Sequence, residues 1–343
     1  MQEQYGQQKQ SFRFTGSGWE YFKIWIVNLL LTILTLGIYS AWAKVRRLQY
    51  FYRNTHLADA TFDYHGKPKA ILKGRIIAIV LLIAYNASFK ISPILGLVAA
   101  VLLGSVMPWL LMRSLRFKLY NSSYRGLRFG FSGDRRGAYR AFLLFPVLAA
   151  MTLYLLAPLA HQRIKLYQFN NSRFGSTAFK LDVSVKGFYL LYLSALAVMI
   201  GAVVLVVALA VMFGAGGGIK GLNMAIVALI PLVILVTILL VGSMFSAYMQ
   251  NLVWGHAELG EHRFYSHVSA RRLLWIGVSN AIGVVLTLGL FIPFAAVRMT
   301  RFKLESMGVE VSGYLTGFIA DQQQQASAAG EETAEMFDVD ISF

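Results

Sequence analysis

The sequence contains no cysteine and little charge. Without thiols, disulfide bonds, thiol catalysis and thiolate metal sites are excluded. Only 14% of the 343 residues are charged, against about 25% in soluble domains. The first ten residues, MQEQYGQQKQ, have neither a basic start nor an apolar core, so we expect no cleavable signal peptide. Phosphate-binding glycine loops, HExxH and Gly-x-Ser-x-Gly motifs are also absent, so we expect no enzyme and no cofactor.

Long apolar runs are the main feature of the chain, and hydrophobic residues make up 57% of it. Runs of about 20 apolar residues span a hydrocarbon core of about 30 Å. The chain has seven such runs, at 22–43, 71–89, 93–112, 140–160, 188–213, 222–249 and 273–297. The sequence therefore predicts an all-α polytopic membrane protein with about seven transmembrane helices.

One short pattern recurs four times, which indicates a structural module built from internal repeats. An apolar stretch reaches a glycine, a small residue or proline follows four positions later, and an arginine five positions after that. The arginines are Arg46, Arg113, Arg163 and Arg298. Proline is tolerated at the first position of a helix, so we predict helix breaks at the glycines of the pattern, Gly37, Gly104 and Gly289. Tyr154 takes the glycine position in the remaining copy.

The connections between the runs also repeat. Each of three arginines is followed after eight residues by an asparagine and after eight more by a phenylalanine, as in Arg46, Asn54 and Phe62. Aromatic and cationic residues mixed after each arginine are typical of interfacial helices at the headgroup level. Alternating aromatic and polar residues ending at glycine predict short β-strands in the connections.

Several of these segments resemble the YjgN-like family of bacterial inner-membrane proteins. The resemblance rests on Thr35 to Arg46 (TLGIYSAWAKVR), Tyr50 to Thr55 and Thr61 to Gly66, and extends from Phe12 to about Gly313. Ala41 stands where the family pattern has proline. The resemblance implies a multi-pass protein of the bacterial inner membrane. It implies no catalytic or ligand-binding residues, because the family has no assigned activity.

Two membrane orientations are compatible with the charges. If all seven runs cross, the loops 44–70 and 113–139, Lys220 and the C-terminal arm share the more basic face, which would be cytoplasmic. Residues 12–120 and 129–256 would then be inverted repeats, as in many transporters. If the first, fourth and seventh runs are re-entrant, all Lys and Arg except Lys90 and Lys220 lie on one face. Run length favours crossing.

Two functions follow from these patterns. The first is a transporter or channel for a small or anionic substrate. Its candidate intramembrane polar residues are Asn28 and Asn280, which could instead bond neighbouring helices, and the spans hold almost no ionisable residue. The alternative is a non-transporting envelope protein that binds anionic lipids or scaffolds partners.

Arginine and histidine supply the remaining candidate sites. Guanidinium groups bind phosphate, so Arg46, Arg113, Arg163 and Arg298 are candidate contacts for anionic headgroups or an anionic solute; alternatively they only anchor the chain at the interface. A histidine cluster in the fifth connection, with Glu258 and Glu261, lacks helical i,i+4 spacing, and we interpret it as a solvated loop and not a metal site. The cluster is His256, His262 and His267.

The chain divides into three regions. A polar N-terminal segment, 1–11, precedes a repeat-built membrane domain, 12–320, and an acidic tail, 321–343, whose composition predicts disorder. We expect the tail to be cytoplasmic and to serve as a docking peptide for a protein partner or only as a solubilising segment. The expected partner of the membrane domain is the phospholipid bilayer, with anionic lipids. Nucleic-acid binding is not expected despite a net charge of +16, because the cations flank apolar runs.

Overall fold

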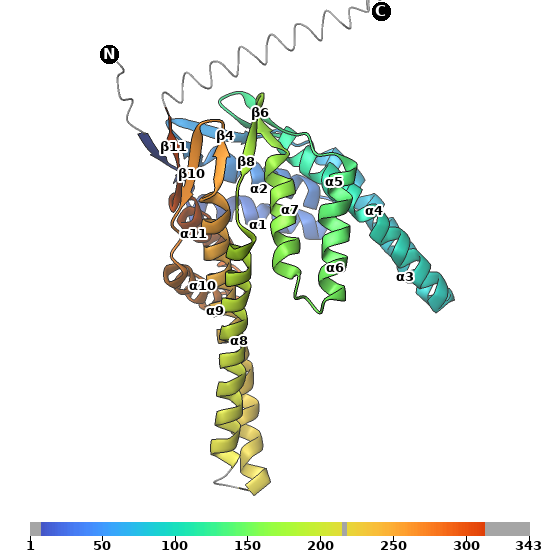
Figure 1. Cartoon of the computed structure of the whole chain (residues 1–343), viewed down its shortest axis with the longest axis vertical. Helices are drawn as coiled ribbons and strands as arrows, with labels where there is room; N and C mark the ends of the chain where they lie inside the picture. The colour runs from blue at the N-terminus through green and yellow to red at the C-terminus, as the bar shows by residue number, and fades with distance from the viewer. Residues whose placement is uncertain (1–7, 215–217, 313–343) are drawn as a thin grey trace, which may run out of the picture.

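The eleven strands of the fold form one antiparallel sheet from which helices extend (Figure 1). The structure, a computed structural model, describes residues 8–214 and 218–312. The strand order is β1-β11-β10-β9-β8-β7-β6-β5-β4-β3-β2. The strands are β1 Gln8–Ser11, β2 Arg13–Phe14, β3 Thr55–Leu57, β4 Ala60–Tyr64, β5 Ser122–Tyr124, β6 Leu127–Phe131, β7 Ser172–Phe174, β8 Thr177–Leu181, β9 Ala257–Leu259, β10 His262–Ser266 and β11 Met307–Val311.

The sheet curves until its two ends meet. Its terminal strands, β1 and β2, are separated in the chain by Phe12 alone. β1 pairs with β11 and β2 pairs with β3, while the Phe12 N–H donates to the Met307 carbonyl at 3.1 Å. We call this nearly closed sheet the strand ring.

The strand ring has five similar joints. At each joint, the residue just after a strand donates its N–H to the carbonyl of the residue at the end of a helix. The five donor and acceptor pairs are Thr15 to Asn54 (3.0 Å), His65 to Asn121 (2.7 Å), Ser132 to Asn171 (2.8 Å), Asp182 to His256 (3.2 Å) and His267 to Ser306 (2.8 Å). The three asparagines also donate from Nδ2 to the carbonyl four residues earlier, at 2.7 to 2.8 Å. They thereby add a side-chain hydrogen bond to a carbonyl in the last turn of each helix.

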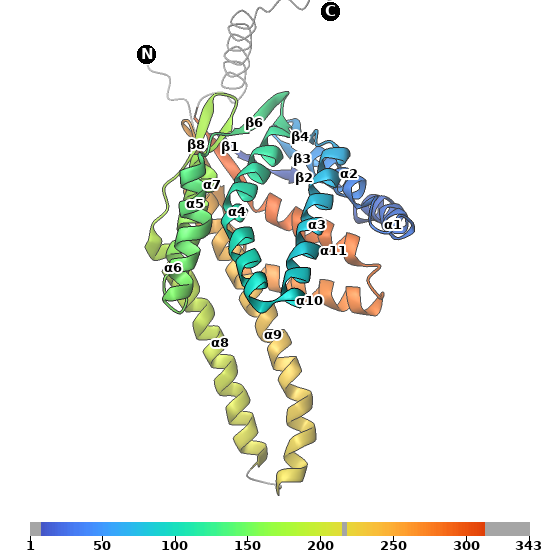
Figure 2. The same ribbon diagram turned by 90° about the vertical axis from the view of Figure 1, so that its right-hand side faces the viewer.

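The helices form antiparallel pairs that leave the strand ring and return to it (Figures 1 and 2). One pair, α8 and α9, extends furthest from the strand ring in both views. The pairs are α1 Gly18–Leu34 with α2 Ser40–Arg53, α3 Pro68–Ile91 with α4 Pro93–Tyr120, α8 Val185–Gly214 with α9 Gly218–Trp254, and α10 Ala270–Leu286 with α11 Ile292–Glu305. In the remaining pair, α7 Ala157–Asn170 lies against a helix made of α5 Arg135–Tyr139, the π-helix η1 Arg140–Leu144 and α6 Phe145–Met151.

The prediction of an all-α protein with about seven transmembrane helices is wrong. Within the described ranges, four helices are long and apolar enough to cross a membrane: α3, α4, α8 over Val185–Leu209 and α9 over Ile230–Trp254. The predicted runs 22–43, 140–160 and 273–297 each form two shorter helices joined by a tight turn. The predicted short strands are also not separate pieces, because they join in one sheet.

A threonine and a left-handed backbone produce each of these tight turns. The side chains of Thr35, Thr152 and Thr287 donate to the carbonyl four residues earlier and accept the N–H four residues later. The next residues have positive φ, which reaches 91° at Gly37 and 94° at Gly289. Apolar length alone does not reveal such a reversal, which explains why these runs resembled single spans.

The inverted arrangement of two three-span units is likewise wrong. The strands in all the long connections are hydrogen-bonded in the strand ring, so the connections lie at one end of the molecule. The re-entrant alternative, which gathers the basic connections on one face, matches this geometry. Gly104, predicted as a helix break, lies within the continuous helix α4.

Parts of the predicted domain division lie outside the described residues. The tail 321–343, residues 1–7 and the end of the predicted 12–320 domain beyond residue 312 belong to these parts.

Gly37 and Gly104 provide a matched test of the turn. A Cβ added at either glycine meets no atom within 4 Å, but only Gly37 has positive φ. We expect Gly37→Ala to destabilise the fold by about 1–2 kcal/mol, because L-residues disfavour the left-handed region. Gly104→Ala should stabilise it by up to about 1 kcal/mol, because alanine favours a helix. Thermal unfolding in one detergent would measure both, and shifts of the same sign would contradict the turn geometry.

Candidate functional site

The inside of the strand ring is lined by phenylalanines. Side chains alternate between the two faces of a strand, and the central residue of most longer strands points inward. Five rings from this region stack as neighbours, with centroid distances of 6.0, 6.4, 6.4 and 5.9 Å in order. They belong to Phe12, Phe62, Phe129, Phe179 and Phe264, which we call the phenylalanine circle.

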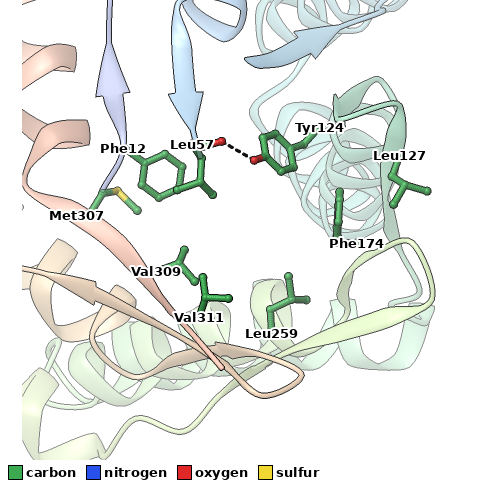
Figure 3. Close-up of a cluster of buried hydrophobic side chains, with 9 residues drawn as sticks. All are labelled: Phe12, Leu57, Tyr124, Leu127, Phe174, Leu259, Met307, Val309 and Val311. Atoms are coloured by element: carbon green, nitrogen blue, oxygen red, sulfur yellow. Dashed lines mark hydrogen bonds between the residues drawn. The ribbon is translucent and has the colours of Figure 1, made fainter. Parts of the chain in front are cut away.

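A cluster of buried side chains packs against the phenylalanine circle and shares Phe12 with it (Figure 3). Phe12 and Leu57 come from one part of the strand ring, Val309 and Leu259 from another, and all point toward the same interior. The Tyr124 hydroxyl donates to the Leu57 carbonyl, which links neighbouring β-hairpins. The members of this buried cluster are all hydrophobic.

The side chains leave a cavity of about 480 Å³ inside the strand ring. It is bounded by the phenylalanine circle and by the ends of α2, α4, α9 and α11. The helix ends supply polar groups, of which Tyr52, Lys118, Gln250 and Lys303 are the largest. Pockets of about 300–1,000 Å³ hold single small molecules, so the ring cavity has the size and lining of a site for one largely apolar ligand.

A second pocket of about 640 Å³ lies beside the ring cavity and shares Gln250, Trp254 and Lys303 with it. Its other lining residues come from α7 and α9, so it is a groove between α7, α9 and α11. It extends along α9 from Val241 to Trp254, which is about 20 Å at 1.5 Å per residue. We call it the α9 groove.

Two lysines in the α9 groove lack acidic partners. Lys303 donates from Nζ to Ser246 Oγ at 2.7 Å, and Gln250 donates from Nε2 to the Lys303 carbonyl at 2.9 Å. The ion pairs found among the described residues use carboxylates of β4, β9 and β11 and do not include Lys165 or Lys303. Burial lowers the pKa of both lysines, with no nearby carboxylate to oppose it. The groove thus presents uncompensated positive charge beside an apolar cavity.

The four predicted arginines do not form one site. They are exposed on α2, α4, α7 and α11. Three of them lie over aromatic rings, at 5.8 Å for Arg46 and Tyr39, 4.5 Å for Arg113 and Trp109, and 5.7 Å for Arg163 and Phe145. Arg298 instead donates to Asn280 Oδ1 at 2.7 Å and to Ser279 Oγ at 3.1 Å. Their role in binding anionic headgroups stays a prediction.

The two predicted asparagines are buried in equivalent short helices, α1 and α10. Asn280 also donates to the Ala295 carbonyl of α11 at 3.3 Å. Asn28 Oδ1 has no hydrogen-bond partner among the described residues. Gly37 and Gly289 lie at the tips of the α1–α2 and α10–α11 pairs.

The histidine cluster does not converge on a metal site. The described part of the chain contains no group of three or more His, Asp or Glu side chains placed to hold a metal ion.

Sequence reasoning missed the phenylalanine circle and the groove lysines as site residues. The repeated position of phenylalanine after asparagine was a usable signal for strands. It did not reveal that the strands close around a common interior, because closure depends on pairing between the first and last strands of the chain.

Among the described residues, a strand ring of antiparallel strands carries paired helices, four of them long and apolar enough to cross a bilayer, which defines this chain as an α+β membrane protein and not an all-helical one. The chain belongs to the family described as bacterial protein of unknown function (DUF898), whose profile matches residues 9–336. This confirms the family resemblance inferred from the repeated motifs.

Three curated relatives share part of the sequence. The chain is 34% identical over 146 residues to the inner membrane protein YjgN of Salmonella typhimurium, and 30% identical over 142 residues to the protein of that name from Escherichia coli K12. Each match covers 41% of this chain and 36% of the relative, so the chain spans about a third of the length of these relatives. No solved structure matches the chain.

Arg298 and Arg46 occupy equivalent positions but should differ in their effect on stability. Arg298→Gln removes the donor to the buried Asn280 Oδ1, and an unsatisfied buried polar group costs about 1–3 kcal/mol. Arg46→Gln removes only an exposed contact with Tyr39, worth about 0.5–1 kcal/mol. Thermal unfolding of the two variants would compare them. Equal losses would mean that the Asn280 contact does not stabilise the fold.

Proposed function

We propose that this chain is a non-transporting, non-catalytic inner-membrane protein that binds an amphiphile, with the apolar part of the ligand in the ring cavity. The observation that carries the proposal is the ring cavity itself, lined by the phenylalanine circle and adjoining the α9 groove, with which it shares Gln250, Trp254 and Lys303. The groove gives a membrane lipid a lateral path to the cavity.

We infer that the strand ring faces the cytoplasm. The basic connections all contribute to the strand ring, whereas Lys90 lies at the far end of α3 and Lys220 near the start of α9. Cytoplasmic loops carry an excess of Lys and Arg, which supports this orientation. The predicted cytoplasmic location of the C-terminal tail follows from it, because β11 is part of the strand ring.

Helix lengths support two depths of insertion. From the start of α2 at Ser40 to Arg46 and from the start of α11 at Ile292 to Arg298 the chain advances six residues, or about 9 Å of helix, roughly a third of a 30 Å core. From Pro93 to Arg113 it advances twenty residues, or about 30 Å. If the arginines mark the headgroup level, α3 and α4 cross the bilayer and the short pairs enter only one leaflet. The tip residues Leu36 and Leu288, each 95% exposed, would then contact acyl chains.

The same arrangement argues against a transporter. The helix pairs all start and end at the strand ring, so the part of the chain that the structure describes lacks two halves of opposite orientation around a midplane site. The polar groups that face a cavity lie near the strand ring, at the ends of the helices. A protein that binds a ligand from one leaflet needs polar groups only at that side of the membrane.

Single cysteines would test the orientation, because the chain has no native cysteine. Asp59 and Glu261 lie in exposed hairpin turns of the strand ring, and Lys90 lies at the far end of α3. Each would be replaced by cysteine in a separate variant. We expect an impermeant thiol reagent to label Lys90→Cys in intact cells, and the other two only in opened vesicles. Labelling of Asp59→Cys and Glu261→Cys from opposite sides would overturn the orientation.

Hexadecanol, a neutral single-chain amphiphile, would test the ring cavity. We expect the purified protein to bind it. Phe129→Trp, which fills part of the cavity, should weaken binding about fivefold or more, because each excluded methylene costs about 0.8 kcal/mol. Phe142→Trp, in a separate cluster with Tyr167, is the matched control. Absence of hexadecanol binding, or equal effects of both variants, would contradict the proposed function.

A further inference from the structure

The α9 groove contains a second chemical feature that apolar binding does not require. Lys165 of α7 and Lys303 of α11 line it from different helices. Both side chains are partly buried, although a buried cation without a partner is unfavourable. Ser246 and Gln250 of α9 add two neutral polar groups on the same wall.

Within 8–214 and 218–312, the charge in the groove has no carboxylate as counterion. Lys9, Arg53 and Arg263 pair with carboxylates on the strands, and these ion pairs are largely solvated. Lys165 and Lys303 have no such partner in the described residues, and burial is the cause of the lowered pKa in each. An anionic group in the groove would meet two cations and two hydrogen-bonding side chains.

The position of the groove matches the headgroup region of the bilayer. Lys165 follows Arg163 by two residues and Lys303 follows Arg298 by five. Both lysines are therefore displaced from the arginines toward the strand ring by about 3–8 Å of helix. Lys303 also lines the ring cavity, so a ligand whose head lies at Lys303 can place its chain among the phenylalanines.

We propose that the α9 groove selects a single-chain amphiphile with an anionic head, held by Lys165 and Lys303 while its chain enters the ring cavity. This inference rests on the proposed function and adds the ligand class and the head-binding residues. A cavity of about 480 Å³ is in the range for one small molecule, which favours one acyl chain over the two chains of a phospholipid.

Gly242 lies near the end of the groove that is furthest along α9 from the strand ring. It lines the groove, and a Cβ added there would meet no atom within 4 Å. Gly201 of α8 has the same open surroundings but does not line the groove. A large side chain at Gly242 would therefore obstruct the groove, whereas the same change at Gly201 would not.

The test compares hexadecyl sulfate, a permanent anion, with hexadecanol, which has the same chain. Full-length protein in phosphatidylcholine nanodiscs should bind the sulfate about tenfold more tightly, because hydrogen bonds to charged groups are the stronger ones. Lys303→Gln should remove most of this preference by weakening hexadecyl sulfate binding much more than hexadecanol binding, and the hexadecanol that the variant still binds reports that it is folded. Lys303→Arg should retain the preference. Lys180→Gln, an exposed strand lysine, is the control for non-specific charge.

The outcomes separate this inference from the proposed function. Equal binding of the two probes, or an equal loss in Lys180→Gln, would overturn anion selection while leaving amphiphile binding intact. Binding of neither probe would contradict both. Displacement of the bound probe by inorganic sulfate alone would identify a site for free anions and also overturn the inference. If the α9 groove is the lateral path, the probe should enter the ring cavity more slowly in Gly242→Phe and at an unchanged rate in Gly201→Phe.

Discussion

The rest of the structure depends on the pairing of the first strand with the last. β1 binds β11 along four residue pairs, and β2, one residue further on, binds β3. The sheet is thereby nearly closed, with β1 and β2 as its terminal strands. It also joins segments about 300 residues apart in the sequence, a separation that makes such contacts costly to form. The helix pairs keep their positions because each starts and ends at a strand of this ring.

Closure also explains why an apolar cavity exists. Inward-facing side chains of a curved sheet converge on one axis. A cavity remains wherever these side chains do not fill the interior. Here the phenylalanines stack side by side around the circumference, with centroids about 6 Å apart. The space between them remains as the ring cavity, and the polar helix ends form its other wall. Packing and cavity thus come from the same side chains.

The turns of the short helix pairs also determine where the groove lysines lie. Threonine-capped turns reverse the chain within each short pair, and the basic C-terminal parts of α7 and α11 lie next to α9. This places Lys165 and Lys303 against a long apolar helix, away from the carboxylates on the outside of the strand ring. The membrane segments and the candidate site therefore depend on the same reversals of the chain.

Residue patterns alone indicated the membrane character, the family and several of the places where the chain changes conformation, although not at Gly104, which lies within α4. Apolar length identified α3, α4, α8 and α9, and alternation marked strand positions such as Phe62 and Phe129. The same apolar length misled at Gly37, Tyr154 and Gly289, because a run of one composition can cross once or reverse halfway. Only the tertiary structure decided that the strands close into one ring, that the connections share one side, and that Lys303 meets Ser246. These features depend on contacts between distant segments, whose register a local pattern does not encode.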